Sequence, residues 1–465
     1  MIPDANRSIQ RMAAILGMLG LGLWASPAIA QLAPWQQPPS VDRIDRSELS
    51  NYPHSDPLPQ GEGTSARSDR LAPVPDTAEN SPAYWAREDY EQDGGPFGFG
   101  RGYLPDLACD LVHDRFWVRS EFLAWWTKGF ATPSLLTTGP GTNSSQAGVL
   151  DAPGTSVLLG GKDFQGGFHP GVRLALGAWL NASQTMGIEG SYFQLSRQTE
   201  FFNTSGVSVP VLARPFFNSE TGQQDSQIVN FPGQQSGTFS STSSTELQVA
   251  EVLVRKNLNQ QPGFAFDMMA GYRYQQLEDH LAVGDTLTFS GTQSGFPAGT
   301  IVQQSDRFDT RNAFQGGEVG MSTTFRRQWW SIDALLKIAV GQTHSRVTID
   351  GATTTTIPGQ AATSLPGGFL ALPSNMGVHD SDQFSVMPEL GVTLGFDLSS
   401  QLRATIGYDL LYWNAVARPG DQIDLNIDPR QFPPPAITNA TRPEFILHTS
   451  DYWAQGLNLG LDLRF

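Results

Sequence analysis

Strict alternation of apolar and polar residues dominates the chain from residue 114 onward. In the stretch 401–415, for example, Leu402, Ala404 and Ile406 fall on one face and Arg403 falls on the other. A period of two is that of a β-strand with one apolar and one wet face. The sequence has ten such stretches, near 114–127, 169–181, 184–200, 243–258, 262–280, 310–326, 329–347, 383–399, 401–415 and 449–465.

The connections between these stretches alternate in length. The short turns are four: residues 181–183, the Asn259-Gln-Gln-Pro-Gly263 turn, Arg327-Gln328 and Ser400. The other connections run to roughly thirty or forty residues rich in Gly, Ser, Thr and Pro. Short turns at one end and long loops at the other are typical of outer-membrane barrels. We therefore expect an all-β fold, an antiparallel up-and-down transmembrane β-barrel of about ten strands. A weak strand within 140–168 would raise the count to twelve, and the range we consider is eight to twelve.

The last stretch ends on an apolar row with an aromatic terminus. The row comprises Leu457, Leu459, Leu461, Leu463 and Phe465. In a soluble protein an exposed row of this kind at an edge strand invites aggregation. We therefore expect it to face outer-membrane lipid and to serve as the C-terminal signal of the outer-membrane barrel assembly machinery. The alternative is an ordinary amphipathic edge strand.

If the apolar rows face lipid, the opposite face carries fourteen charged residues, eight acids and six bases. A charge on the lipid face costs about 2–4 kcal/mol near the membrane midplane, so these side chains are expected to line the lumen. Two interpretations stay open: a paired network that fills a narrow lumen, or a constriction that selects solutes by charge. The residues are Arg119, Glu121, Arg173, Glu189, Glu251, Arg255, Asp267, Arg273, Glu318, Asp333, Lys337, Glu389, Arg403 and Asp409.

The N-terminal part has a different character. Residues 1–30 combine two arginines, an apolar run and the small residues Ala28 and Ala30, which predicts a cleaved signal peptide and export. Residues 31–110 are rich in Pro, Gly and Ser without an apolar period, and predict a disordered periplasmic linker. The barrel is then expected to occupy residues 111–465, in the cell outer membrane.

Composition narrows the function. The net charge of -16 and the pI of about 4.8 argue against a nucleic-acid partner. One cysteine, Cys109, excludes an internal disulfide framework and a cysteine-based zinc site. Mean hydropathy is -0.25. Apart from the apolar run within residues 1–30, the sequence has no apolar run long enough to suggest a membrane helix. We find no nucleotide, haem or nucleophile motif, so we expect no cofactor, no metal site and no enzymatic activity.

Two groups of residues are minor candidates for a catalytic or calcium-binding site. Histidines and aspartates near the predicted extracellular strand ends suggest, remotely, an outer-membrane protease that activates water; they are His344, His379, Asp380, Asp382, His448 and Asp451. Asp421, Asp424 and Asp428 lack the glycine and final glutamate of a calcium loop, which favours a solvated acidic loop.

Several segments together resemble one family. They are Trp117-Val-Arg-Ser-Glu-Phe-Leu-Ala-Trp-Trp126, Thr132-Pro-Ser-Leu-Leu-Thr-Thr-Gly-Pro140, Leu159-Gly-Gly161, Gly167-Phe-His-Pro-Gly-Val-Arg173 and Gly187-Ile-Glu-Gly-Ser-Tyr-Phe193. This set is similar to that of β-barrel porin family seven, and the resemblance covers about 114–465. It implies an outer-membrane barrel whose substrate is not established, and it assigns no catalytic or ligand residue.

Two classes of function follow. The first is a porin-like pore or substrate-specific channel in which the lumen charges set the selectivity for small solutes. The second is a closed structural or surface-binding barrel that acts through its long extracellular loops. In either class we expect a monomer, and the two differ in whether the lumen charges pair completely.

Overall fold

The computed structural model describes residues 115–292, 295–434 and 439–465. The predicted signal peptide with Ala28 and Ala30, and the predicted linker, lie outside these residues. In the described part of the chain, no helix is long and apolar enough to cross a membrane.

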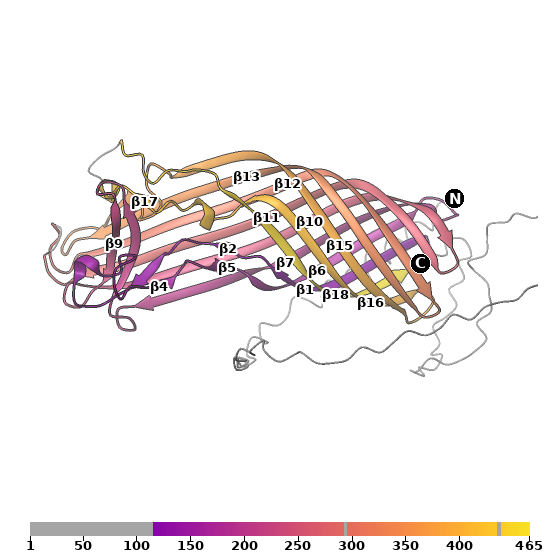
Figure 1. The fold of residues 1–465 in the computed structure, drawn as a ribbon, viewed down its shortest axis with the longest axis horizontal. Coiled ribbons are helices and arrows are strands. Elements are labelled where there is room, and N and C mark those ends of the chain that lie inside the picture. The colour runs from indigo at the N-terminus through magenta and orange to yellow at the C-terminus, as the bar shows by residue number, and fades with distance from the viewer. Residues whose placement is uncertain (1–114, 293–294, 435–438) are drawn as a thin grey trace, which may run out of the picture. The chain divides into compact units, whose positions relative to one another are not determined.

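Ten antiparallel strands close into a ring (Figure 1). Each strand pairs with its neighbour in the order β12, β11, β10, β7, β6, β1, β18, β16, β15, β13, and a β12–β13 pairing closes the circle. The predicted barrel of about ten strands is therefore confirmed. The strands are β1 (Phe116–Thr127), β6 (Gly167–Trp179), β7 (Met186–Ser205), β10 (Gln235–Gln261), β11 (Phe264–Phe289), β12 (Ile301–Arg327), β13 (Trp330–Thr356), β15 (Gly377–Asp397), β16 (Leu402–Ala417) and β18 (Thr449–Arg464).

The first and last strands meet at a regular seam. Trp117 lies opposite Arg464, and the pairing of β1 with β18 continues without a shift to Thr127 and Ala454. Phe116 and Phe465 exchange two backbone hydrogen bonds, of 2.8 and 3.0 Å. Their rings stack with centroids 6.2 Å apart. The C-terminus thus lies at the same end of the barrel as the short turns (Figure 1).

An apolar band surrounds the half of the barrel nearest the short turns. On β13 the outward residues run from Trp330 through Ile338 and Val340, and then change to Gln342 and His344. Exposed aromatic side chains border the band on both sides, which is the girdle pattern of transmembrane barrels. Near the short turns these are Phe116, Phe325, Trp329 and Phe465, and at the other border Trp126, Phe168, Tyr192, Tyr272, Tyr274 and Tyr412.

Several strands continue far beyond the apolar band, so the connections from β11 to β12 and from β13 to β15 are shorter than the predicted thirty to forty residues. Residues 281–309, expected as a loop, instead form the end of β11, a short connection and the start of β12. Beyond the band the alternation is inverted: Leu281 and Val283 point inward, whereas His280 is partly exposed on the outer face. A sequence argument that looks for apolar residues on the lipid side therefore ends these strands too early.

The long loops fold into short strands that pack at the long-loop end of the barrel (Figure 1). They comprise β2 (Phe130–Ala131), β3 (Leu136–Thr138), β4 (Ser156–Leu159), β5 (Asp163–Phe164), β8 (Leu212–Asn218), β9 (Gln223–Asn230), β14 (Thr363–Pro366) and β17 (Asn426–Ile427). The short strands β4 and β5 occupy the suspected region 140–168 and do not enter the ring. Side chains of these loops and of the strand extensions share one buried apolar cluster, called here the loop core.

Candidate functional site

The barrel interior at the level of the apolar band is lined by charges, called here the charged layer. Its centre is a cluster of two cations and three carboxylates. The Lys337 ammonium lies 2.8 Å from Glu251, 3.1 Å from Glu389 and 3.7 Å from Glu318. The Arg273 guanidinium lies 3.1 Å from Glu251 and 3.4 Å from Glu318, and it also pairs with Glu389. Each cation therefore touches all three carboxylates.

Smaller ion pairs surround this cluster. Arg173 lies 3.0 Å from Glu121 and 2.7 Å from Asp409, and its guanidinium covers the ring of Phe193 at 4.9 Å. Nearer the short turns, Arg255 reaches Glu189 and Asp267 at 3.5 Å each, while Arg403 pairs with Asp333.

All fourteen sequence-predicted lumen residues lie in this charged layer, and each takes part in at least one ion pair. Sequence reasoning missed two members, Asp462 and Arg464, which lie on the inner face of β18. Asp462 forms ion pairs with Arg119 and Arg464 at 3.5 Å and with Arg403 at 3.9 Å. Their alternation with the leucine row was the available signal.

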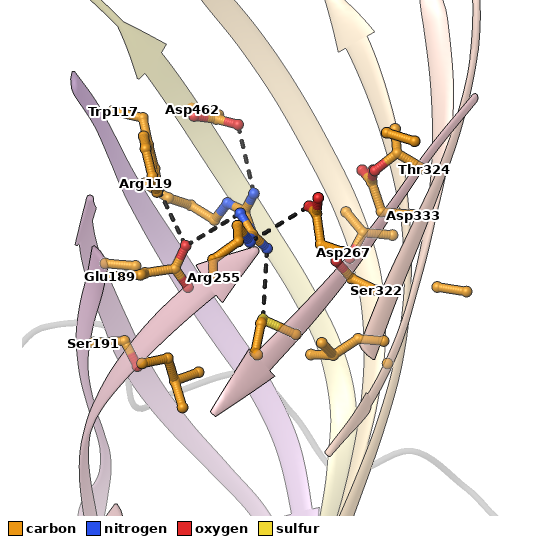
Figure 2. A pocket seen from close by; sticks show the side chains of 18 of the residues that line it. Trp117, Arg119, Glu189, Ser191, Arg255, Asp267, Ser322, Thr324, Asp333 and Asp462 are labelled. Atoms are coloured by element: carbon orange, nitrogen blue, oxygen red, sulfur yellow. Dashed lines mark hydrogen bonds and ion pairs between the residues drawn. The ribbon is translucent and has the colours of Figure 1, made fainter. Parts of the chain in front are cut away.

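A cavity of about 480 Å³ lies between the charged layer and the short turns (Figure 2), and it is called here the vestibule. Its walls combine the aromatic residues Trp117 and Trp179 with charged side chains, and turn residues such as Gln261 and Ser400 form its rim. The floor includes Lys337 of the charged layer. The vestibule therefore ends at the paired charges.

On the other side of the charged layer, wall side chains fill the lumen with apolar groups. This apolar layer includes Trp125, Phe314, Trp413 and Tyr452, all fully buried. The Trp413 indole donates to the Thr343 hydroxyl at 3.0 Å. The remaining members are Leu123, Phe193, Leu195, Leu247, Val249, Leu277, Ala339, Met387, Leu411, Val416 and Ala454.

The loop core is fixed to the barrel wall by buried charges that sequence reasoning did not find. Arg214 of β8 is wholly buried and lies 2.9 Å from Asp285 and 2.7 Å from Asp306. One Asp306 oxygen also accepts three backbone N–H groups of residues 369–371, at 2.8 to 2.9 Å. Arg418 pairs with Asp279 at 2.7 Å. These charges lie where the outer face is polar, so alternation did not distinguish them.

The histidine and aspartate candidates do not form one site. His344 lies 2.9 Å from Asp382 and 3.5 Å from Asp380, on exposed side chains of β13 and β15. The His379 ring stacks on Phe445, with centroids 3.8 Å apart. Asp451 pairs instead with Lys128 at 2.6 Å, and the backbone N–H of the third histidine, His448, donates to the Gln422 side chain at 3.3 Å.

The three loop aspartates each have their own partner. Asp421 accepts from the Ser450 hydroxyl at 2.9 Å. Asp424 pairs with Arg442 at 3.1 Å, and Asp428 pairs with Arg430 at 2.7 Å.

The C-terminal row points out of the barrel. Leu457, Leu459, Leu461 and Phe465 are all exposed on the outer surface, and Leu463 is partly exposed. This row contributes to the apolar band next to the seam.

Comparison with known proteins gives one family and several distant structures. The family model described as "Putative beta barrel porin-7 (BBP7)" matches residues 117–465. The Escherichia coli outer membrane protease OmpT is 8% identical over 77% of this chain and 99% of its own, with a TM-score of 0.35. A Pseudomonas aeruginosa FadL homologue is 9% identical over 76% of this chain and 90% of its own, with a TM-score of 0.21. The Pseudomonas putida toluene transporter TodX is 9% identical over 75% and 89%, with a TM-score of 0.21. No protein with a curated description matches the chain.

A closed ring of ten strands, an apolar band between aromatic girdles and a charged interior define a transmembrane β-barrel. The chain belongs to the beta barrel porin-7 family. The resemblance noted from the sequence is thereby confirmed.

Proposed function

We propose that this protein is a monomeric outer-membrane barrel of a diderm bacterium whose lumen is closed to passive diffusion in this conformation. On this proposal the short turns face the periplasm, and the loop core stands at the cell surface as the functional part. Export through the N-terminal signal peptide and insertion by the barrel assembly machinery complete the proposal. No catalytic role is included, because the exposed pair of His344 and Asp382 lies on the outer face of the barrel wall.

The apolar layer is the observation that carries this proposal. Fully buried Trp125, Phe314 and Trp413 meet inside the barrel. An ion crossing such a layer loses its hydration shell without compensation, which costs tens of kcal/mol in a medium of low dielectric constant. The ion pairs of the charged layer below it support the same conclusion, because these side chains are already held by opposite charges.

Planar-bilayer recording tests the proposal. The refolded full-length chain is first shown to be strand-dominated by circular dichroism. We expect the wild-type protein to give no single-channel conductance. A triple variant, Trp125→Ala, Phe314→Ala and Trp413→Ala, should conduct if it folds, because these changes remove the largest side chains of the apolar layer. Stable single-channel steps from the wild-type protein would contradict the closed lumen.

A substrate-specific channel is the second candidate, and the vestibule favours it. A concave site of about 480 Å³ falls within the range of roughly 300–1,000 Å³ that is usual for small-molecule pockets. On this alternative, binding of a solute in the vestibule would part the apolar layer. Conductance that begins only after a solute is added would support it.

A further inference from the structure

Four arginines of the vestibule lining lie where it opens between the short turns. Arg119, Arg403 and Arg464 all converge on Asp462, at 3.5, 3.9 and 3.5 Å. Arg326 lines the same opening, and within the described residues it forms no ion pair. We call these four side chains the arginine mouth. Asp462 and Asp333, which pairs with Arg403, are the carboxylates in contact with them.

The arginine mouth holds more positive charge than its own contacts neutralise. Arg119, Arg403 and Arg464 share the one carboxylate of Asp462, so their like charges lie near one another and repel. Repulsion of this kind weakens with distance and with dielectric constant, and a concave protein surface reduces the screening by water. A bound anion is the simplest way to offset it.

Hydrogen-bond donors are also left over. The Nε atoms of Arg119 and Arg403 are shielded from water and have no hydrogen-bond partner. Arg403 is buried, with a side chain that is only 5% exposed. A guanidinium offers five N–H donors in a planar fork, which matches the oxygens of a phosphate or carboxylate group.

Trp117 and Arg255 border the cavity beside the arginine mouth. Figure 2 shows Arg119 and Arg255 in the same part of the cavity, with Asp462, Glu189 and Asp267 around them. Arg255 is held by Glu189 and Asp267 at 3.5 Å each, so its charge is compensated. The indole of Trp117, which donates to Glu189 at 3.2 Å, adds an apolar surface.

We propose that the arginine mouth binds a small oxyanion, a solute that carries a phosphate or carboxylate group, from the periplasmic side. Its phosphate or carboxylate oxygens take the place of Asp462 as acceptors for Arg119 and Arg464. This proposal does not depend on whether the lumen conducts, because the ligand enters and leaves by the same opening.

Isothermal titration calorimetry on the detergent-folded full chain tests it. The probes are inorganic phosphate and succinate, and chloride at equal ionic strength controls for screening. We expect saturable binding of at least one oxyanion. The substitutions Arg119→Gln and Arg464→Gln should each weaken binding by about tenfold to a hundredfold, as expected for a charge-assisted hydrogen bond. The preference between phosphate and succinate identifies the ligand class.

Two further variants make the result decisive. Asp462→Asn removes the carboxylate that competes for the same guanidiniums, so it should tighten binding. Arg197→Gln removes an exposed arginine that pairs with Glu246 on the outer surface, so it should leave binding unchanged.

The proposal is overturned if neither oxyanion gives saturable heat above that of chloride. It is also overturned if Asp462→Asn weakens binding, or if Arg464→Gln has no effect in a protein that unfolds at the wild-type temperature. Because the conductance assay is separate, a protein that conducts and also binds phosphate would overturn the closed lumen alone.

Discussion

At the scale of single residues, the central cluster of the charged layer contains one carboxylate more than its cations balance. Lys337 and Arg273 both form ion pairs with Glu251, Glu318 and Glu389. Neither oxygen of Glu318 has a hydrogen-bond partner, and its contacts with the cations are the longest of the three. The five residues are therefore unequal in their contribution to stability.

We predict that Lys337→Met lowers the free energy of unfolding by about 3–5 kcal/mol, because it leaves three buried carboxylates with one cation. Glu318→Gln should change stability little or raise it, since it balances the charges at constant shape. Urea unfolding in detergent, followed by tryptophan fluorescence, measures both. A larger loss for Glu318→Gln than for Lys337→Met would contradict the assignment.

The loop aspartates predict opposite pH effects. Burial raises the pKa of Asp421, whereas hydrogen bonds from Arg430 lower the pKa of Asp428. Above its unfolded pKa of 3.8, folded Asp421 retains its proton more strongly than unfolded Asp421 does, so its contribution to stability falls as pH rises through the folded pKa. Asp428 contributes stability above its unfolded pKa and loses it as pH falls.

Asp421→Asn should therefore be more stable than wild type at pH 7, and Asp428→Asn should be less stable. The difference for Asp421→Asn should shrink as pH falls from its raised folded pKa toward 3.8, and the difference for Asp428→Asn should shrink as pH falls below 3.8. Thermal unfolding of the three proteins between pH 3 and pH 7 checks the signs. The same sign for both variants at pH 7 would show that the carboxylate environments are not as described.

At the scale of elements, the sequence predicts the membrane part of each strand and little of what lies beyond it. On β13 the outward row from Ile332 to Val340 contacts lipid, so apolar alternation identifies it. Past His344 the inside becomes apolar because Val347 and Ile349 pack on the loop core. Whether that inside contacts folded loops or water depends on chain segments far apart in sequence, and local periodicity carries no such information.

The same limit applies to the candidate site. The lumen charges follow from alternation because a charge on the lipid face is costly. Arg214 does not, because β8 belongs to a loop and its partners Asp285 and Asp306 lie on two other strands. Long-range pairing of this kind needs the three-dimensional structure.

Attachment of β8 to the wall gives an element-scale prediction. Arg214→Leu leaves Asp285 and Asp306 buried without their cation. This should lower the free energy that holds β8 against the barrel wall by about 3–5 kcal/mol. The loop that contains β8 should then become sensitive to a broad-specificity protease, while the barrel strands stay protected. Limited proteolysis with mass spectrometry locates the cuts.

Arg346→Leu is the matched control, because Arg346 and its partner Asp380 both have exposed side chains on the barrel wall. Its cleavage pattern should match that of the wild type. Equal protection of the β8 loop in both variants would mean that the apolar contacts of the loop core suffice.

At the scale of the whole molecule, Phe465 is predicted to matter for assembly more than for stability. Deleting it removes one ring stacked on Phe116, worth at most about 1.5–3 kcal/mol of burial. The remaining β1–β18 pairing should hold the barrel closed. We expect the truncated chain to refold in detergent from urea but to accumulate poorly in the outer membrane of cells.

Phe465→Tyr keeps an aromatic end residue and should accumulate normally. Equal membrane levels of wild type and truncation would remove the assembly-signal interpretation. Failure of the truncation in both assays would mean that Phe465 is needed for the fold itself.

The seam between β1 and β18 lastly bears on chain connectivity. Phe116 and Phe465 face each other through paired hydrogen bonds, as the two sides of a hairpin do. In a variant that begins at Phe116, a short peptide can therefore join the two residues, and the chain can be opened instead at Gln328, between β12 and β13. Circular permutation is usually tolerated where termini lie close together. Because the ring is closed, each of its ten strands keeps the same two neighbours wherever the chain begins. The folded barrel therefore does not require that β1 be synthesised first.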